Sequence, residues 1–575
     1  MINLNGCCNF IFDYLTKNSQ IEFTFINQNF VFKQGLNLPE KRPGYYSPGT
    51  LSCFCPYTMQ ATATHRTTAY YLPAGLILLK MVLHYCIINP VYDLHRDEYL
   101  HLDMAGHLAG GYLSVPPFTA VTSLLIKWLG GSFFWVKFFP ALFGALTLLL
   151  VMWIVRELKG GMYALLLASA AFIFSSMLRL NMLYQPNSFD VLCWTWVFYL
   201  LIRYIHTGHR KCLLWLGVAI GLGFLNKYNI LFLVAGLVPA VLLSPQRKVF
   251  FNRYLYAGVL IALLLALPNV IWQLRNGMPV LHHMEELSRF QLVHVDRFDF
   301  LRSQFLFFFS GFFLVASGLL ALLFYRPFRP YLFLGLTYLF VILLFLYLRA
   351  KSYYALGLYP MLLAFGGVCW ERLFSARWLK YVRALWLVLI IAPFCYLFNV
   401  IFPVLSPAAI QEKSKKFREL GMLRWEDGRD HALPQDFADM LGWREMTALS
   451  RQAYARVPDS DKPYTLIMCG NYGQAGALNY YNRGSGMPPA RSFSADYVFW
   501  FPPVDTLHYI ILVDDEPDKR AQEHATTIIK VGQVQQPLAR EYGTGVYLLS
   551  GLSPDLPARF RTWRQQRMQE FRAWR

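Results

Sequence analysis

The sequence predicts an α-helical polytopic membrane protein with a small α/β domain at its C-terminal end. Of its 575 residues, 56% are hydrophobic and only 15% are charged, whereas soluble domains usually carry about 25% charged residues. Apolar runs of membrane-spanning length follow one another along the first 400 or so residues. Beyond residue 405 the composition changes to mixed charge with Pro and Gly, and shorter strand-like runs appear.

The formal net charge of +19 at first suggests a nucleic-acid partner. The charge is unevenly distributed, however: residues 405–575 hold 22 Lys and Arg against 20 Asp and Glu, so a net of +17 lies in the apolar residues 1–404. Basic residues in short loops between apolar runs are typical of membrane proteins. The lipid bilayer is therefore an expected partner, and nucleic acid is not.

About eleven apolar runs predict membrane-spanning helices. They lie at 68–89, 133–155, 161–178, 188–205, 212–226, 228–243, 254–273, 303–324, 331–348, 354–371 and 384–404. The short runs 212–226 and 228–243 are interpreted as two helices joined by a tight turn at the membrane surface. One broken span is the alternative, and it would invert the orientation of everything downstream.

The distribution of Lys and Arg predicts the orientation. With the N-terminus in the cytoplasm, the cytoplasmic loops hold 14 Lys and Arg in 44 residues, and the opposite loops hold 10 in 91 residues. This asymmetry follows the positive-inside rule. It places the loops around 90–131, 178–188, 226–229, 275–302 and 349–354, together with the C-terminal part, outside.

Three regions are expected: a cytoplasmic segment 1–67, a transmembrane catalytic domain 68–404 and an extracytoplasmic α/β domain 405–575. Residues 1–58 carry no signal-peptide pattern, and we expect translation to begin at Met59. In the last region, 464–469 and 507–513 predict strands, and 436–454 predicts a helix. No cysteine has a metal-ligand spacing with histidine.

The first outer loop contains two adjacent acids, Asp97 and Glu98, at the membrane boundary. They are either solvated acids at the end of a helix or a catalytic base beside the membrane. The residues that follow, 99–109, predict a short amphipathic helix in the interface, which Pro116 and Pro117 end.

A further acid, Asp190, begins an otherwise apolar run and follows Asn187 in the second outer loop. An ionisable group in a span favours a functional site. The alternative is that Asn187 caps the helix and Asp190 stabilises its first turn.

Basic and aromatic residues meet in two other outer loops: Lys227 in a tight turn, and Lys351 beside Tyr353 and Tyr354. These residues either belong to the interfacial belt of a membrane protein or bind an anion, for which Lys is well suited. Acidic and basic side chains are thus expected on one side of the membrane. A lipid-linked phosphate donor would need the basic ones, and a hydroxyl acceptor would need a carboxylate as base.

These residues, in this order and topology, resemble the GT-C membrane glycosyltransferases of glycosyltransferase family 39. That family includes protein O-mannosyltransferases, and the lipid A aminoarabinose transferase is a close relative. The resemblance covers about 68–400 and rests on Asp97-Glu98, Pro116-Pro117, Asp190, the run 221–228 and the run 351–360. The runs 433–443 and 470–477 look like the C-terminal region of bacterial members, which implies a bacterial inner membrane.

The resemblance implies a sugar donor on a polyprenyl phosphate and a glycan, lipid or protein acceptor. Asp97 would deprotonate the acceptor hydroxyl, Glu98 would support Asp97 or contact the acceptor, and the anomeric configuration would invert. Lys227 and Lys351 would stabilise the leaving phosphate, and Asp190 matches a second acid of the fold. No cofactor is implied with certainty, although a divalent metal ion is left open.

One departure concerns the phosphate. Many relatives carry a basic residue before Pro-Pro, but Ser114 and Val115 precede Pro116 here, so the phosphate would rely more on Lys227, Lys351 or Arg96. The rival interpretation is a transporter or flippase of lipid-linked sugars. The sequence has no internal repeat, and its unusual charges lie at one boundary rather than at the bilayer midplane, which favours the enzyme.

Overall fold

The computed structural model describes residues 63–375 and 379–571. The chain forms two compact units, Met1–Tyr71 and Leu72–Arg575. The expected start at Met59 lies outside the described residues. The expected boundary near 405 falls within the second unit and stays a prediction.

Apolar helices make up most of residues 72–401, as the long apolar runs predict. Among the described residues, six helical segments are long and apolar enough to cross a membrane, or eight if two bent pairs each count as one span. The six are α5 (Phe133–Glu157), α8 (Asn187–Thr207), α11 (Arg253–Arg275), η5–α15 (Arg326–Tyr331 and Leu332–Tyr347), η6–α16 (Ser352–Leu358 and Tyr359–Leu373) and α17 (Arg383–Ile401).

The bent pairs and several shorter apolar helices complete this region. The pairs are α10 (Ile230–Leu242) with η2 (Pro245–Phe251), and α13 (Arg297–Phe307) with η4 (Phe309–Gly311) and α14 (Phe312–Phe324). The shorter apolar helices are α2 (Ala63–Cys86), α4 (Phe118–Trp128), α6 (Met162–Ile173) and α9 (Lys211–Asn226). Each of the eleven predicted runs overlaps a helix, but the count of eleven spans is not confirmed.

The remaining helices of this region are short and lie in connections. They are α3 (Arg96–Asp103), η1 (Met104–Gly106), α7 (Ser176–Leu180), α12 (Pro279–Phe290), η3 (Leu292–His294) and η7 (Leu379–Val382). The interfacial helix predicted over 99–109 is thus α3 followed by η1, and it starts three residues earlier than predicted.

Hydrogen bonds sort the connections into the two sets that the sequence predicts. At one end of the helices, His206 bonds Glu157, Arg372 donates to Leu158 O, and Gln246 donates to Pro330 O. At the other end, the connections around 97, 185, 187, 227, 229 and 354 bond one another. The turn at 226–229 therefore joins two separate helices, as the two-helix interpretation requires.

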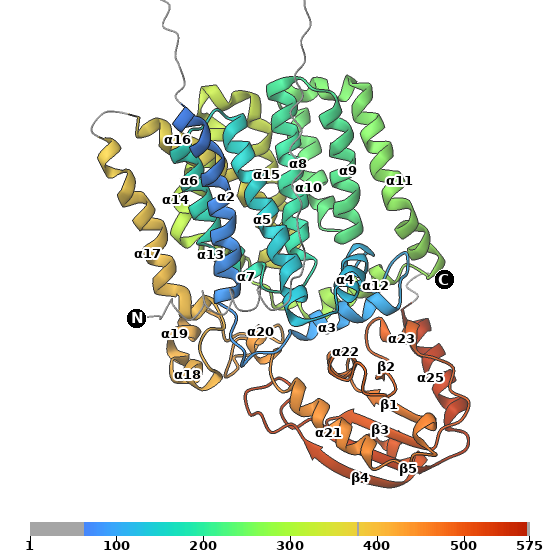
Figure 1. Cartoon of the computed structure of the whole chain (residues 1–575). Helices are drawn as coiled ribbons and strands as arrows, with labels where there is room; N and C mark the ends of the chain where they lie inside the picture. Colours follow the sequence, from blue (N-terminus) through green and yellow to red (C-terminus); the bar gives the residue numbers. More distant parts are fainter. Residues whose placement is uncertain (1–62, 376–378, 572–575) are drawn as a thin grey trace, which may run out of the picture. The chain divides into compact units, whose positions relative to one another are not determined.

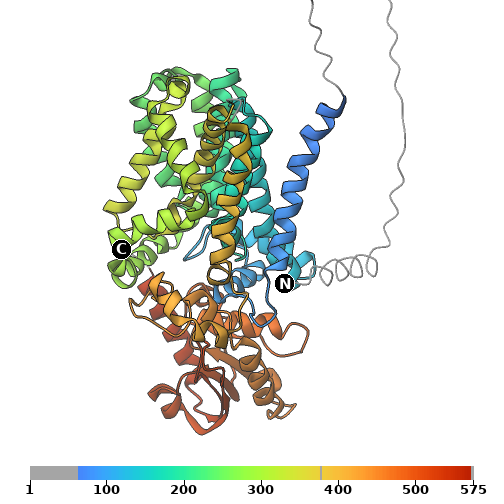
Figure 2. The same cartoon turned by 90° about the vertical axis from the view of Figure 1, so that its left-hand side faces the viewer.

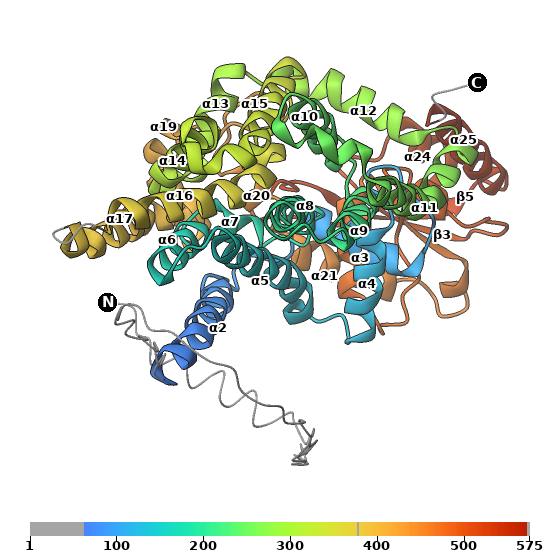
Figure 3. The same ribbon diagram turned by 90° about the horizontal axis from the view of Figure 1, so that it is seen from above.

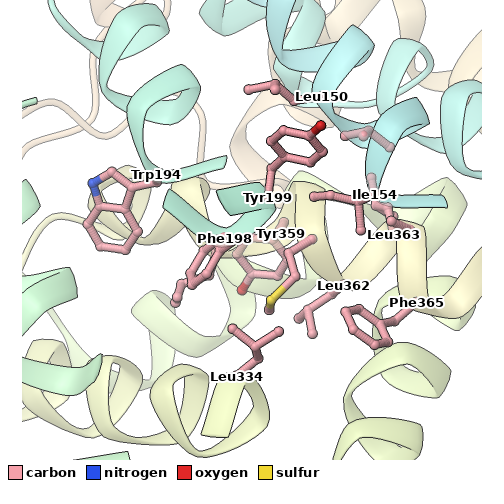
Figure 4. Close-up of a cluster of buried hydrophobic side chains, with 14 of the residues drawn as sticks. Leu150, Ile154, Trp194, Phe198, Tyr199, Leu334, Tyr359, Leu362, Leu363 and Phe365 are labelled. Carbon is pink, nitrogen blue, oxygen red and sulfur yellow. The ribbon is translucent and has the colours of Figure 1, made fainter. Parts of the chain in front are cut away.

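Close backbone approach packs these helices where glycines face each other. A Cβ built on Gly217 of α9 would lie 2.0 Å from the carbonyl oxygen of Gly258 in α11, so neither position has room for a side chain. Small residues at such crossings are typical of membrane helices. Elsewhere large side chains fill the interior, as Figure 4 shows for Phe198, Tyr359 and Phe365.

Two helices are mostly exposed along their apolar length. Only 17% of the apolar window of α11 and of α17 is buried, and the two lie at opposite margins of the helical region (Figure 1; Figure 3). Exposed apolar helices of this length are what a bilayer covers. This observation agrees with an integral membrane protein.

The C-terminal residues fold into a five-stranded sheet with helices, as predicted. The strands are β1 (Thr465–Cys469), β2 (Arg491–Ser492), β3 (Tyr509–Asp514), β4 (Ala525–Gln533) and β5 (Gly545–Leu552), in the spatial order β2-β1-β3-β5-β4. β1 is parallel to β2 and β3, whereas β5 is antiparallel to β3 and β4. Both predicted strands, 464–469 and 507–513, coincide with β1 and β3.

The C-terminal residues also contain helices. They are α18 (Pro407–Glu412), α19 (Ser414–Glu419), α20 (Gln435–Ala438), α21 (Trp443–Ala455), η8 (Lys462–Tyr464), α22 (Tyr472–Tyr481), α23 (Tyr497–Trp500), α24 (Lys519–His524) and α25 (Leu556–Glu570). The single helix predicted over 436–454 is divided into α20 and α21, because Gly442 adopts a φ of 85° that a continuing helix does not allow.

One helix joins this C-terminal region to the first connection of the membrane helices. α22 packs against α3, and Gly476 of α22 has Tyr99 of α3 against its backbone. Figure 1 shows α22 on the side of the sheet that faces α3, and Figure 2 shows the orange and red C-terminal region below the helical region from a second side. α3 is therefore held between the membrane helices and the C-terminal fold.

Candidate functional site

The first turn of α3 presents the two predicted acids, and its capping fixes their positions. The His95 side chain caps the helix by accepting from the Asp97 backbone N–H, and the Glu98 carboxylate accepts from the His95 backbone N–H. This reciprocal capping box satisfies the free N–H groups of the first turn. Asp97 and Glu98, as neighbours, then point in different directions.

Asp97 is held by neutral donors and remains accessible. Its Oδ1 accepts from the Tyr472 hydroxyl at 2.8 Å, its Oδ2 accepts from Gln185 Nε2 at 2.9 Å, and its side chain is 32% exposed. Burial acts to raise the pKa of Asp97, but His95, Arg96 and the Tyr472 hydroxyl outweigh it and hold the pKa at about 2. The carboxylate is therefore ionised at neutral pH and has lone pairs left for a further donor.

Glu98, in contrast, is fully buried and fully bonded. Lys137 of α5 donates to both of its oxygens at 2.7 and 2.8 Å, and the backbone N–H of Tyr184 donates to Oε1 at 2.7 Å. Glu98 thus ties α3, α5 and the connection before α8 together. Of the two expected roles, this geometry favours support of Asp97 over contact with an acceptor.

Arg96 precedes Asp97 in the chain, as Glu98 follows it. Its guanidinium stacks on the Tyr472 ring, 4.5 Å from the centroid, and its buried Nε has no hydrogen-bond partner among the described residues. A half-buried cation with an unpaired donor is a natural contact for an anion.

Lys227, Tyr353 and Tyr354 meet as the sequence predicts. The Lys227 ammonium lies 5.0 Å from the centroid of the Tyr353 ring and 4.3 Å from that of Tyr354, and it donates to Asn187 Oδ1 at 2.7 Å. Cation–π contacts of this kind hold an ammonium without neutralising it. The charge of Lys227 thus remains available to a ligand.

Asp190 is buried beside this cluster. It accepts from Trp194 Nε1 at 3.1 Å and from Asn229 Nδ2 at 2.7 Å, and Asn229 also donates to the backbone oxygen of Tyr354 at 3.0 Å. Asp190 therefore links α8 to η6 and lies near enough to Lys227 for the two charges to interact.

Lys351, which the sequence predicts to bind the phosphate beside Tyr353 and Tyr354, forms an ion pair with a residue of the C-terminal region. Its ammonium pairs with Glu426 of the C-terminal region, at the edge of a groove of about 670 Å³. The groove is lined by side chains from α7, the α12–α13 connection, α13, η6 and residues 418–436, among them Arg179, Tyr353 and Asp436. Tyr353 belongs both to this groove and to the Lys227 cluster, so the groove adjoins the cluster.

Two polar residues that sequence reasoning missed complete the site. Gln185 and Tyr472 both donate to Asp97, yet Tyr472 is 375 positions away in the sequence and neither residue carries a charge. The run 470–477 that contains Tyr472 matched the bacterial C-terminal pattern, and this was the only signal for it. Among the described residues, no group of three or more His, Cys, Asp or Glu side chains is arranged to hold a metal ion.

Comparison with known proteins agrees with this architecture. A family model for dolichyl-phosphate-mannose-protein mannosyltransferase matches residues 114–272. The lipid A galacturonosyltransferase RgtD of Rhizobium johnstonii is 25% identical over 214 residues, which cover 36% of this chain and 43% of that protein. The chain thus matches less than half the length of this relative.

Two solved structures share the fold. ArnT from Cupriavidus metallidurans bound to undecaprenyl phosphate superposes with a TM-score of 0.58 at 15% identity, covering 85% of this chain and 98% of ArnT. Its apo form gives 0.54 at 15% identity, covering 84% and 98%. The expected resemblance is therefore confirmed: the chain shares the fold of these ArnT structures, and its residues 114–272 match the mannosyltransferase family model.

Proposed function

We propose that this protein is an integral membrane glycosyltransferase that moves a sugar from a polyprenyl phosphate to a hydroxyl group of a glycan, lipid or protein. The single observation that carries the proposal is the pairing of an accessible, ionised Asp97 with the Lys227 cluster on neighbouring connections. Such a transfer needs a base for the acceptor and a cation for the leaving phosphate, and this end of the helices offers both.

The donor phosphate is assigned to Lys227, Tyr353 and Tyr354, with Lys351 and Arg96 as further cations. The contacts of Lys227 are two aromatic faces and an amide oxygen, and no carboxylate of the described residues lies within salt-bridge distance of it. The Tyr353 and Tyr354 hydroxyls add donors for phosphate oxygens. Lys351 joins once the phosphate competes with Glu426, its exposed partner.

In the reaction, the acceptor oxygen attacks the anomeric carbon while its proton passes to Asp97. The bond between that carbon and the phosphate oxygen breaks, and its electron pair leaves with the phosphate. Lys227 stabilises the charge that grows there. A single displacement of this kind inverts the anomeric configuration, and Glu98 contributes by fixing the turn that carries Asp97.

The acceptor is assigned to the groove beside Tyr353, and the protein to a bacterial inner membrane with the C-terminal region outside. The groove is lined by both arginines and carboxylates, among them Arg302, Arg424 and Asp299, so it offers donors and acceptors to the hydroxyl groups of a sugar. Its position between the outer loops and the C-terminal region agrees with a donor presented from the outer face of the membrane.

The proposal is tested by sugar transfer with purified protein in lipid vesicles. Radiolabelled polyprenyl-phosphate hexoses and pentoses serve as donors, and extracted bacterial envelope lipids and glycans serve as acceptors. We expect Asp97→Asn to lower transfer by at least about 1,000-fold. The control is Asp93→Asn, because Asp93 also accepts from a tyrosine of α22 (Tyr481, 3.0 Å) but has no role in the reaction; it should keep nearly full activity.

Two outcomes would overturn the proposal. The first is full transfer by folded Asp97→Asn. The second is movement of the lipid-linked sugar across the vesicle membrane without transfer, which would establish the transporter interpretation instead.

A further inference from the structure

A continuous row of hydrogen bonds connects the Lys227 ammonium with the Asp97 carboxylate. Lys227 Nζ donates to Asn187 Oδ1 at 2.7 Å, Asn187 Nδ2 donates to Gln185 Oε1 at 3.0 Å, and Gln185 Nε2 donates to Asp97 Oδ2 at 2.9 Å. We call these three bonds the amide relay. All three donors point the same way, from the cation to the anion.

The direction of the amide relay is fixed by its ends. An ammonium only donates and an ionised carboxylate only accepts, so each amide between them must turn its oxygen to Lys227 and its NH₂ to Asp97. Aligned hydrogen bonds polarise one another. The positive charge of Lys227 is therefore felt at Asp97 through two neutral side chains.

We propose that Gln185 is a positioning residue for the base, and that Gln185 and Asn187 couple donor binding at Lys227 to the orientation of Asp97. This inference rests on the proposed function. Gln185 fixes the plane of the carboxylate from one oxygen while Tyr472 fixes it from the other. A donor phosphate on Lys227 replaces the contact that Asn187 makes there, and the far end of the same relay holds the base.

The first test replaces Gln185 with Leu, which has similar size but makes no hydrogen bond. Loss of a hydrogen bond to a charged group predicts a fall in kcat of about 10- to 100-fold with little change in donor KM. Lys227→Met should instead raise donor KM, and Asn187→Leu, in the middle, should change both. The control is Gln246→Leu, because Gln246 also donates through Nε2 (to Pro330 O, 3.1 Å) at the opposite end of the helices.

The second test is Gln185→Glu, whose pH profile distinguishes positioning from simple packing. The groups that face Asp97 are Arg96 and His101 from its own helix α3, His95 from the N-cap of α3, Tyr472 from α22, Asp436 from α20 and Tyr353 from η6. Because the basic groups and Tyr472 favour an ionised Asp97, a proton shared by the two carboxyls resides on the introduced side chain and restores the donor that Gln185 provides.

Gln185→Glu should therefore work best at low pH and lose activity as the pH rises and the introduced carboxyl ionises against Asp97. Below the pKa of Lys227, which burial lowers to about 8, wild type should show no such loss, since no ionisable group stands at position 185. Either a Leu variant with wild-type kcat or a Glu variant with a wild-type pH profile would overturn the relay. If Asp97→Asn itself keeps activity, the proposed function fails instead, so the two failures are separable.

Discussion

The two ends of the helical region each contain a carboxylate that joins distant segments, and the two are bonded differently. At one end, Glu371 of α16 accepts from the backbone N–H groups of Gly161, Tyr163 and Ala164 at the start of α6. At the other, Asp97 accepts from two side chains, stays 32% exposed and has Arg96 nearby with an unpaired Nε among the described residues.

The two carboxylates differ in the kind of donor that holds them and in the lone pairs that they leave open to a ligand. Glu371 caps a helix with backbone donors that cannot move away, so it has little left to offer a ligand. Asp97 is oriented by side chains and keeps an open face. Glu98, next to Asp97, is also saturated, although its donors include the Lys137 side chain, so location alone does not set how a carboxylate is bonded.

The largest effect on stability is expected where a saturated pair is broken. Lys137→Met leaves Glu98 buried without its cation, and such a loss destabilises a protein by about 3–5 kcal/mol. We expect a large fall in thermal stability in detergent. The double variant Lys137→Met with Glu98→Leu should recover most of it; an undiminished loss in the double variant would show that the pair is not the cause.

The next largest effect is expected on donor binding, at the end of the helices that contains Asp97 and Lys227. Lys227→Met removes the cation but keeps the length of the side chain, so binding of undecaprenyl phosphate should weaken about 10- to 100-fold while stability changes little. Binding to the purified protein measures this. Arg275→Met, an exposed basic residue in the last turn of α11, is the control, and equal weakening in both would argue for a general charge effect.

A smaller effect is expected from the C-terminal contact with the base. Tyr472→Phe removes one of two side-chain donors to Asp97 and should lower kcat about tenfold. Tyr481→Phe removes the matching donor to Asp93 and should leave kcat unchanged. Equal rates for both variants would mean that α22 holds α3 without acting on the base.

The smallest effect should follow from weakening the opposite end. Glu371→Gln keeps one carbonyl oxygen for the start of α6 but loses the charge, so stability should fall by about 1 kcal/mol. Transfer activity per folded protein should stay the same. A clear loss of kcat would contradict the division between the two ends.

Much of the fold could be predicted because apolar length is a local property. The two helices that flank Asn226–Asn229, α9 and α10, and the strands β1 and β3 each follow from a single continuous apolar run in the sequence. The division of 436–454 at Gly442 was missed because a glycine near a helix end is compatible with either continuation or a turn. α9 is shorter than the candidate membrane spans, so an apolar run in the sequence does not by itself establish a span.

The charged half of the site was predictable, and the neutral half was not. Asp97, Asp190, Lys227 and Lys351 are conspicuous because ionisable groups are rare beside apolar runs. Gln185 and Tyr472 carry no such signal, and their contacts depend on how α7, α8 and α22 pack. The different bonding of Asp97 and Glu98 also required the structure, since the partner that distinguishes them, Lys137, lies 39 positions from Glu98.

The most direct test of the central claim is the rate of the chemical step with the donor already bound. Wild type and Asp97→Asn are saturated with the same labelled polyprenyl-phosphate sugar, and transfer is started with acceptor in a single turnover. We expect Asp97→Asn to bind the donor as well as wild type does but to transfer it at least about 1,000-fold more slowly. Transfer at a comparable rate by the donor-loaded variant would contradict the assignment of Asp97 as the base.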